Sequence, residues 1–255
     1  MGGGAIAAAI AAAVWAYLAP GLASSERLRV VRLRAGLGPR ILFLTDIHYH
    51  AGRGKERLIE ALLECLRPDV VLLGGDTIDE FTPRPESVRG LLETIASHCR
   101  ACYAVTGNHE HACIRMGRLS WRRLLAVFES SGCPMLLDQE AGLPGSGASV
   151  AGLMWRDDPR EYSIPLSRID AELVVSHSPD AFRHVPPGRR VVMLSGHTHG
   201  GQICLPGGRP IYTNSRYGYR SGLYRRGGSI LYVSRGIGEM MPPRLYCWRE
   251  AVLLE

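Results

Sequence analysis

Several features are missing from this sequence, and each absence removes a class of protein. No internal repeat occurs at solenoid or propeller periods, and no low-complexity segment is present. With 46% hydrophobic and 21% charged residues, the composition is that of a globular protein rather than a disordered chain. No basic run is interleaved with aromatic residues in the way that a nucleic-acid groove requires, so no nucleic-acid partner is indicated.

The cysteines are irregularly spaced and lysine is scarce, and both facts are informative. The seven cysteines are odd in number and irregularly spaced, which excludes a disulfide framework. Cys99 and Cys102 form a single Cys-x-x-Cys pair, and a zinc site of this kind would need a second pair. Lys55 is the only lysine, so the net charge of +6 depends on arginine. That charge is compatible with an anionic substrate or an anionic membrane surface.

What is present begins with an apolar N-terminal segment. Residues 5–23 carry no charge over 19 positions, which is just long enough to cross a bilayer. We expect residues 1–24 to be a hydrophobic anchor or a signal segment cleaved near Ala23, and the lack of a preceding basic residue favours the anchor. The positive-inside rule then favours a membrane-associated protein whose domain faces the cytoplasm, with export as the alternative. The rule applies here to the arginines that follow closely: Arg27, Arg29, Arg32 and Arg34.

From residue 40 onward, short apolar runs alternate with helical patterns. The apolar runs at 41–46, 70–76 and 103–108 have the length and continuity of buried strands. Between and after them, apolar residues recur at helical spacing within 58–66, 88–95 and 121–128. This order predicts an α/β fold with a parallel core sheet.

The second half of the chain is richer in strand patterns and glycine. We expect these strands to form a second sheet that packs face to face with the first. No segment has the composition of a linker, so residues 40–255 are predicted to form a single domain. The expected strands lie at 149–153, 172–177, 191–197, 230–234 and 251–254.

Nearly every predicted strand ends in side chains that commonly bind metals. Ligands in open α/β sheets bind beyond the carboxyl ends of the strands, so we expect these side chains to converge. Each motif alone has a simpler explanation, such as a surface turn, a helix cap or a core histidine. Together, a buried cluster of this kind would be costly unless metals or partners satisfied it. Its members are Asp46, His48, Asp76, Asp79, Asn108, His109, His177, His197 and His199.

The chemistry of this set favours a pair of divalent transition metals. Mixed aspartate, histidine and asparagine ligands suit manganese, iron or zinc better than magnesium alone. More than six ligands is too many for one ion, whereas two ions sharing a carboxylate fit. Paired ions about 3.5–4 Å apart stabilise the oxygens of an in-line phosphoryl displacement. On an extended segment, His197 and His199 would project to the same side, so that each could serve one ion.

These residues fall into five short sequence blocks, one after each of five predicted strands. In chain order, the blocks resemble the motifs of the calcineurin-like metallophosphoesterase superfamily. The tail of the chain resembles a subgroup of small bacterial and archaeal phosphodiesterases, often exported or membrane-anchored, which is itself similar to membrane-associated UDP-2,3-diacylglucosamine pyrophosphatases. The resemblance implies a four-layer α/β/β/α sandwich. The blocks are Asp46-x-His48, Gly75-Asp76-x-x-Asp79, Gly107-Asn108-His109-Glu110, His177 and Gly196-His197-x-His199, with Arg216-Tyr217-Gly218 and residues 231–238 in the tail.

The resemblance also implies a role for each residue of the set. It assigns Asp46, His48 and His199 to one metal, and Asn108, His177 and His197 to the other, with Asp76 bridging the two. A hydroxide shared by the metals would attack phosphorus, and His109 would protonate the leaving oxygen as a general acid. Asp79 would orient His109.

We therefore expect a metal-dependent phosphoesterase, most simply a phosphodiesterase or pyrophosphatase, acting on a small-molecule or lipid-linked phosphoester near a membrane. A metal-dependent nuclease is one alternative, and a non-catalytic metal-binding scaffold is an alternative of another class. The residues between His109 and Trp121 leave no room for a large cap domain. His50 and His111 are candidates for substrate contact or exposed loop positions. Arg53, Arg216 and Arg244 are either solvated or available to a second phosphate.

Overall fold

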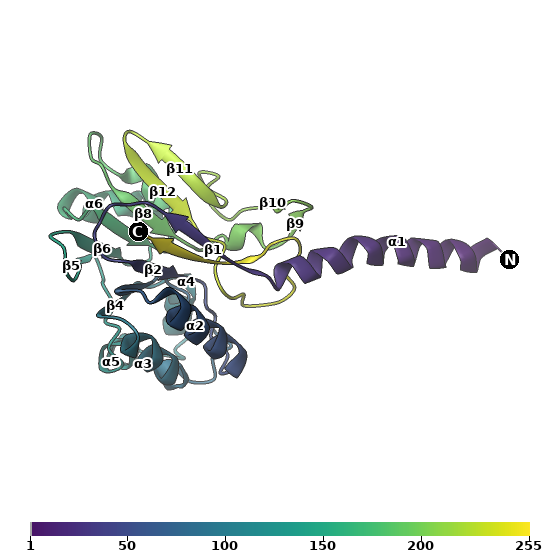
Figure 1. The fold of residues 1–255 in the computed structure, drawn as a ribbon, viewed down its shortest axis with the longest axis horizontal. Coiled ribbons are helices and arrows are strands. Elements are labelled where there is room, and N and C mark those ends of the chain that lie inside the picture. Colours follow the sequence, from purple (N-terminus) through teal and green to yellow (C-terminus); the bar gives the residue numbers. More distant parts are fainter. Residues whose placement is uncertain (1) are drawn as a thin grey trace.

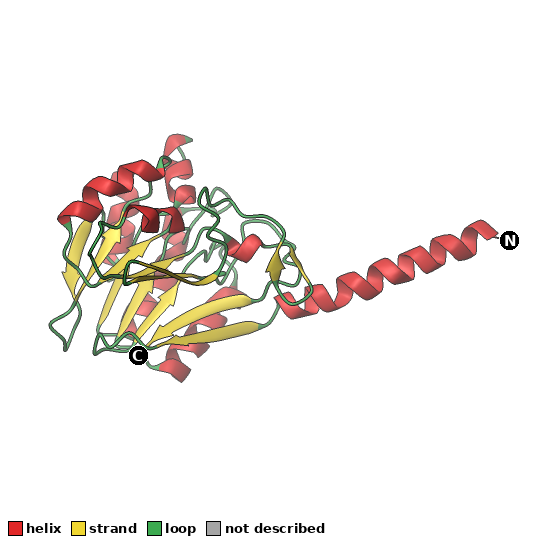
Figure 2. Ribbon diagram, turned by 90° about the horizontal axis from the view of Figure 1, so that it is seen from above, coloured by secondary structure: helices red, strands yellow, loops and turns green. Residues whose placement is uncertain are grey.

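The computed structural model describes residues 2–255, apart from the side chains of residues 2–6 and 53. Two mixed β-sheets lie face to face, and helices cover their outer faces (Figures 1 and 2). The first sheet has the order β1 (Leu28–Leu33), β13 (Arg249–Leu254), β2 (Ile41–Leu44), β3 (Val70–Leu73) and β4 (Ala101–Ala104). The second has the order β11 (Gly222–Arg226), β12 (Ser229–Val233), β8 (Val192–Ser195), β7 (Leu173–Ser176), β6 (Ser149–Leu153) and β5 (Gln139–Gly142).

Helical elements complete the outer layers of the sandwich. Those against the first sheet are α2 (Arg53–Leu66), α3 (Arg89–Ser97) and α5 (Trp121–Ser130), with η1 (Pro85–Val88) beside α3. Those on the second sheet are α6 (Ser163–Arg168), η2 (Pro159–Tyr162) and η3 (Pro179–His184). Two further elements follow strand ends, α4 (Asn108–Arg115) and η4 (His199–Gly201), and β9 (Cys204–Leu205) pairs with β10 (Arg209–Pro210).

Alternation along the central strands explains why their sequences are continuously apolar. In β2, Leu42 and Leu44 pack in the core against the helices, while Ile41 and Phe43 pack in the core between the two sheets. All four are fully buried, because both faces of this strand are covered. The same alternation holds in β3, and the four-layer α/β/β/α sandwich is confirmed.

One predicted strand lies in the other sheet. The run 251–254 was expected in the second sheet, but β13 lies in the first sheet, parallel to β1 and antiparallel to β2. Because its alternate residues face both the helices and the second sheet, it satisfies the same burial pattern as its neighbours. Strand β1 was not predicted, since Arg29 and Arg32 interrupt its apolar residues; its exposed side chains suit the edge position that it occupies.

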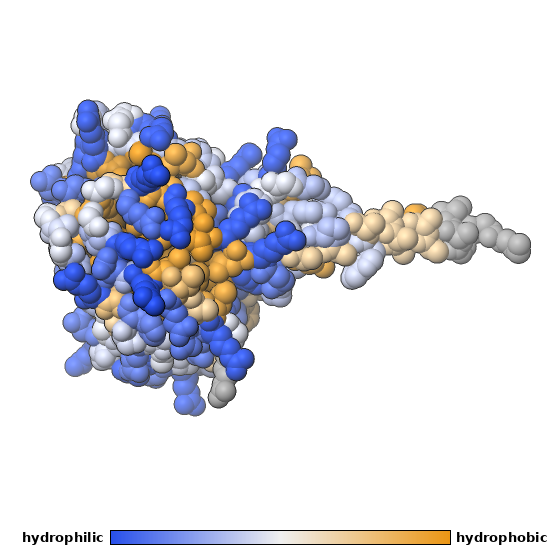
Figure 3. Space-filling view, viewed as in Figure 1, coloured by the Kyte–Doolittle hydropathy of each residue, from blue (hydrophilic) through white to orange (hydrophobic). Residues whose placement is uncertain are grey.

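Helix α1 (Gly2–Ser25) projects away from the sandwich (Figures 1 and 2). Among the described residues it is the one helix that is long and apolar enough to cross a membrane, over Ala7–Ser25. A signal sequence near an N-terminus passes the same test. Figure 3 shows apolar side chains along the projecting part of α1.

Candidate active site

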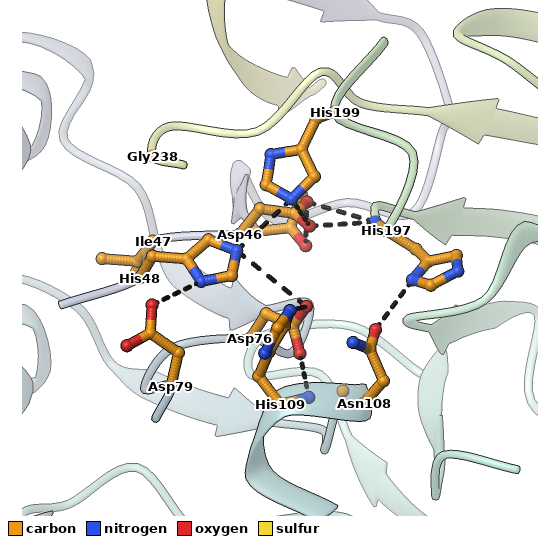
Figure 4. Close-up of polar contacts among 12 residues, drawn as sticks. Asp46, Ile47, His48, Asp76, Asp79, Asn108, His109, His197, His199 and Gly238 are labelled. Carbon is orange, nitrogen blue, oxygen red and sulfur yellow. Dashed lines mark hydrogen bonds and ion pairs between the residues drawn. The ribbon is translucent and has the colours of Figure 1, made fainter. Parts of the chain in front are cut away.

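All nine predicted site residues meet at one end of the sandwich, beyond the carboxyl ends of strands from both sheets. Figure 4 labels all of them except His177. Loops after β2 and β3 bring in aspartates and a histidine, α4 begins with Asn108 and His109, and loops after β7 and β8 bring in the remaining histidines. Within the described chain, potential ligand atoms form three overlapping groups in which all atoms lie within 4.8 Å of one another. These groups are Asp46–His48–His199, His48–Asp76–His109 and Asp76–His177–His197.

The backbone of this site adopts conformations that side chains normally disfavour. Five of the seven predicted metal ligands have positive φ angles, at a cost on the order of 1–3 kcal/mol each. Backbone hydrogen bonds between adjacent loops hold two of them, from Asp46 N to Gly75 O (3.1 Å) and from His48 N to Asp76 O (3.0 Å). Strain of this kind at several adjacent positions is typical of a functional site. The five residues are Asp46, His48, Asp76, His197 and His199.

This geometry corrects the predicted reason for the His-x-His spacing. The segment after β8 is not extended, because His197 has a φ of 70° and His199 opens the single turn η4. The turn directs His197 toward Asn108, with Nδ1 2.8 Å from Oδ1, and His199 toward Asp46, with Nε2 3.3 Å from Oδ1. The two imidazoles therefore serve different halves of the cluster through a turn rather than through strand alternation (Figure 4).

Asp76 lies at the centre of the cluster. Its Oδ2 is 3.0 Å from His177 Nε2 and 4.0 Å from Nε2 of both His48 and His109. Its Oδ1 accepts a hydrogen bond from the backbone N–H of His109 at 2.9 Å. Burial alone would raise the pKa of Asp76, but His177 and the other imidazoles hold it below its usual range. By contrast, burial and the neighbouring Asp76 carboxylate raise the pKa of Asp46 more than His177 and His48 lower it.

The histidine nitrogens that face the centre are prepared to bind cations. Nδ1 of His177 lies 2.8 Å from Gly74 O, and Nδ1 of His48 lies 2.8 Å from Asp79 Oδ2. If each Nδ1 carries the proton, each Nε2 presents a lone pair to the centre, the arrangement usual for metal ligands. His177 Nε2 is fully buried and has no aligned hydrogen-bond partner among the described residues, although the Asp76 carboxylate is 3.0 Å away. A cation between such atoms would satisfy both, so the donor set fits divalent metals.

His109 has a different partner from the one predicted. We expected Asp79 to orient it, but Nδ1 of His109 lies 2.6 Å from Glu80 Oε2. Asp79 is held in a turn by its contacts with the next residues, which directs its Oδ2 toward His48 (2.8 Å) and His50 (2.7 Å) instead. Burial alone would lower the pKa of His109, but the carboxylates of Asp76 and Glu80 raise it above its usual value.

Glu110 is part of the site, although no role was predicted for it. Its fully buried carboxylate accepts four backbone N–H bonds, from Asp76 (3.0 Å), Thr77 (2.7 Å), Ile78 (3.2 Å) and Gly107 (2.8 Å). Burial and the neighbouring Asp76 carboxylate raise the pKa of Glu110. All four hydrogen-bond partners are donors, however, so they favour the ionised carboxylate and leave no acceptor for a proton. This side chain joins the loop of Asp76 to the start of α4. Its position in the Gly107-Asn108-His109-Glu110 block was the sequence feature that could have identified it as a site residue.

A small cleft gives access to the cluster. It has a volume of about 220 Å³, and its wall includes Gln202, Asn214, Met240 and Met241 beside the predicted residues. Asn214 donates a hydrogen bond to His197 O (3.1 Å). None of these four residues was predicted as a site residue: Gln202 ends the motif His197-Thr198-His199-Gly200-Gly201-Gln202 without an assigned role, and the other three come from loops without a recognisable motif.

The remaining candidates occupy varied positions around the site. His50 contacts Asp79, and His111 lies 3.2 Å from Thr106 Oγ1 through Nε2, with its ring edge-on to Trp121. Arg244 is buried rather than solvated, and it donates to backbone carbonyls and to Glu239. Arg216 is exposed. The side chain of Arg53 lies outside the described residues.

The fold and the site together define this protein as an α/β metallophosphoesterase, a metal-dependent phosphoric ester hydrolase. More particularly, the chain belongs to the calcineurin-like phosphoesterase family, whose model matches residues 39–201.

Known proteins support this assignment. The chain is similar to phosphodiesterase YaeI of Escherichia coli (strain K12), with 28% identity over 94% of this chain and 90% of the relative. It is more distantly similar to UDP-2,3-diacylglucosamine pyrophosphatase LpxG of Chlamydia trachomatis, with 24% identity over 91% and 89% of the two chains. The crystal structure of TT1561 of Thermus thermophilus shares the fold, with a TM-score of 0.50 and 12% identity over 80% of this chain and 90% of that chain.

Proposed function

We propose that this protein is a dinuclear metal phosphodiesterase or pyrophosphatase. The observation that carries the proposal is the position of Asp76, which belongs to two of the three groups of ligand atoms and lies against imidazoles from both sheets. A single carboxylate shared by two sets of ligands is the arrangement that a pair of ions requires.

The residues divide naturally between two ions. Asp46, His48 and His199 would hold one ion, and Asn108, His177 and His197 would hold the other, with Asp76 common to both. This mixed donor set suits manganese, iron or zinc. When bound, two such ions supply the positive charge that activates water and neutralises the phosphoryl oxygens.

His109 is the proposed general acid. Glu80 holds its Nδ1 at 2.6 Å, so the ring presents Nε2 toward the cleft, 4.0 Å from Asp76 Oδ2. The two carboxylates favour the protonated imidazole, which can donate its Nε2 proton to the oxygen that leaves phosphorus. Asp79 instead supports His48, because its Oδ2 accepts a hydrogen bond from His48 Nδ1. It therefore orients a metal ligand rather than the general acid His109.

The substrate that we propose is a phosphodiester or pyrophosphate, either a small molecule or a lipid-linked compound. The cleft is small and no cap domain covers it in the described chain, which leaves room for a phosphoryl centre but encloses little of the remaining substrate. The names of the relatives YaeI and LpxG describe a phosphodiesterase and a pyrophosphatase of a lipid precursor, and both reactions suit this cleft.

We further propose that residues 1–24 anchor the protein in a membrane and that residues 40–255, with β1, form one metallophosphoesterase domain. The apolar span of α1 and the arginines after it favour a domain on the cytoplasmic side. Export, with cleavage of the segment as a signal, is the alternative. Mass spectrometry of the mature protein separates the two, because a chain beginning near Ser24 would overturn the anchor.

The function is tested by an activity matrix of metals against substrates. Manganese, iron, zinc, nickel and magnesium would each be assayed with an aryl phosphodiester, an aryl monoester, UDP-2,3-diacylglucosamine and single-stranded DNA. We expect hydrolysis of the diester or the pyrophosphate with a transition metal. Preferential cleavage of DNA, or no hydrolysis with any metal, would contradict the proposal.

The role of His109 needs a separate variant and a matched control. His109→Ala should retain metal but lose about 10²–10⁴-fold in kcat on substrates with alkyl leaving groups, because the leaving oxygen then lacks its proton donor. His184→Ala, at a histidine on η3 that belongs to none of the ligand groups, should leave kcat unchanged. Equal turnover by the two variants would remove the acid role from His109.

A further inference from the structure

Exposed apolar side chains gather between the base of α1 and the cleft. We call this surface the apolar lip and define it by Ile203, Leu205, Ile211, Tyr212 and Met241, all of which are exposed. Hydrogen bonds connect its parts: Ile211 N donates to Ile203 O at 3.4 Å, and the side-chain Nε2 of the neighbouring Gln202 donates to Met241 O at 2.7 Å. The small β9–β10 hairpin that carries much of it lies beside the base of α1 in both ribbon views (Figures 1 and 2).

The base of α1 is fixed to the same part of the domain. Tyr246 donates through its hydroxyl to Tyr17 O at 2.7 Å and through its backbone N–H to Gly21 O at 3.0 Å. Gly21 packs so closely on Leu245 and Tyr246 that a Cβ at this position would clash with both. Leu245 in turn forms a β-bridge with Ile203 of the apolar lip. The helix and the lip are therefore held in a defined relation rather than joined by a free linker.

The length of the candidate span brings the lip to the level of a bilayer. Ala7–Ser25 rises about 28 Å as a helix, close to the ~30 Å hydrocarbon thickness that a spanning helix must cover. A bilayer that contains this whole span must reach the part of α1 that Tyr246 and Leu245 contact, because Tyr17 and Gly21 lie inside the span. Domain surface at this level then enters the interfacial layer, and its large exposed side chains there include the five apolar or aromatic residues of the lip.

We propose that the apolar lip lies in the interfacial layer of a lipid bilayer beside α1, and that the cleft opens along this layer. A bilayer suits the surface better than a protein partner because the lip adjoins a helix that is itself suited to lipid. Tyr212, the most exposed member at 71%, is of the residue type that favours the membrane interface, and the exposed Arg209 in the same hairpin suits anionic headgroups. Since Met241 belongs to both the lip and the wall of the cleft, phosphoesters held at the bilayer surface would reach the site without leaving it.

This inference rests on the proposed membrane anchor, so its test must report on the anchor, the lip and the enzyme separately. The full chain would be reconstituted into phosphatidylcholine vesicles with a minor fraction of phosphatidylglycerol, in a Cys65→Ser background because Cys65 is the exposed cysteine. An environment-sensitive probe would be attached in Tyr212→Cys and, as a control, in Ile164→Cys. Ile164 is a large exposed apolar residue on α6, on the outer face of the second sheet.

We expect nitroxide-labelled lipids to quench the probe at position 212 strongly and the probe at 164 weakly, because interfacial apolar groups penetrate about 5–10 Å. Equal, weak quenching at both positions in protein that floats with vesicles would overturn the lip while leaving the anchor intact. Protein that does not float would overturn both proposals. Turnover of a soluble aryl phosphodiester reports on the active site alone. A preparation that fails on this substrate is inactive for reasons unrelated to contact between the lip and the bilayer.

A functional readout uses charge at the lip. Ile211→Asp combined with Leu205→Asp should lower turnover of a vesicle-embedded lipid phosphodiester roughly tenfold, since two acidic groups oppose both apolar insertion and anionic lipid. Turnover of the soluble aryl phosphodiester should be unchanged. Ile164→Asp is the matched control, since Ile164 is 58% exposed and Ile211 is 59% exposed. An equal loss on both substrates, or no loss on either, would contradict the proposal.

Discussion

Replacing Glu110 by glutamine should destabilise the domain far more than this small change in shape suggests. Each oxygen of the Glu110 carboxylate accepts two backbone N–H bonds, so the amide nitrogen of glutamine must face two donors in either orientation. Two bonds to a charged acceptor are lost, each worth about 1.5–3 kcal/mol, and no water can replace them because Glu110 is fully buried. We expect the free energy of unfolding to fall by about 3–6 kcal/mol.

The assay is urea unfolding in mild detergent with a chelator present, followed by tryptophan fluorescence. The chelator prevents bound metal from stabilising the folded state of one variant more than that of another. The midpoint should fall while the dependence on urea stays unchanged, since the same surface is exposed on unfolding. Glu172→Gln is the matched control: its carboxylate is exposed and accepts one backbone N–H, from Ser149 at 3.0 Å, so we expect a change within about 0.5 kcal/mol. A loss below about 1 kcal/mol for Glu110→Gln would refute the reasoning that the ionised carboxylate holds the two loops together.

Four further substitutions test other parts of the structure. Asp76→Asn should weaken the binding of both metals, measured by elemental analysis after dialysis, and retention of two metals at wild-type affinity would rule out the shared carboxylate. Glu80→Gln should lower kcat about tenfold on alkyl leaving groups with KM unchanged, while Asp79→Asn should instead weaken metal binding; the reverse pattern would restore Asp79 as the partner of His109. Burial would raise the pKa of Glu239, but the guanidinium groups of Arg249 and Arg244 lower it. The unfolded state therefore binds the proton more readily than the folded state does. The stability of the folded state should fall as the pH drops below the usual glutamate pKa of about 4.3. Acid unfolding of Glu239→Gln should lack this contribution, and a slope identical to that of the wild type would contradict it.

The site was largely predictable because it depends on local sequence at strand ends. Each apolar run was long enough to identify as a strand, and the residues that follow parallel strands of one sheet must meet at one edge. That rule brought Asp46, Asp76 and Asn108 together from positions far apart in the chain. The same logic placed His177 and His197 after the strands of the second sheet.

Two details of the site depend on turns that spacing does not specify. Asp79 and Glu80 are adjacent acids, and the family resemblance implied that Asp79 would hold His109. The turn that Asp79 forms with Thr82 and Phe81 sends one carboxylate toward His48 and leaves Glu80 for His109. Similarly, the left-handed backbone at His197 could not be inferred from residue type, because histidine adopts it more often than most residues but still in a small minority of cases.

The placement of the run 251–254 shows a different limit. An apolar strand of this kind could belong to either sheet, because the central strands of both sheets are covered on both faces. The apolar pattern does not indicate which strand lies beside it. Its partners are set by packing between segments that are distant in sequence. Strand β1 was missed for the opposite reason, since an edge strand of six residues interrupted by two arginines has little apolar signal.

The position of β13 also determines when the enzyme can become active during its synthesis. Val252 pairs with Phe43 although the two lie near opposite ends of the domain's sequence, and β13 is also the strand to which β1 is joined. While the ribosome is still translating the second half of the chain, β2 has one unpaired edge and β1 has no partner. A hydrophobic α1 that engages a membrane early would hold the nascent domain there in this incomplete state. Stalled or truncated chains that stop before Arg249 would then remain at the bilayer with an open sheet, where they are targets for chaperones and proteases rather than partially active enzymes.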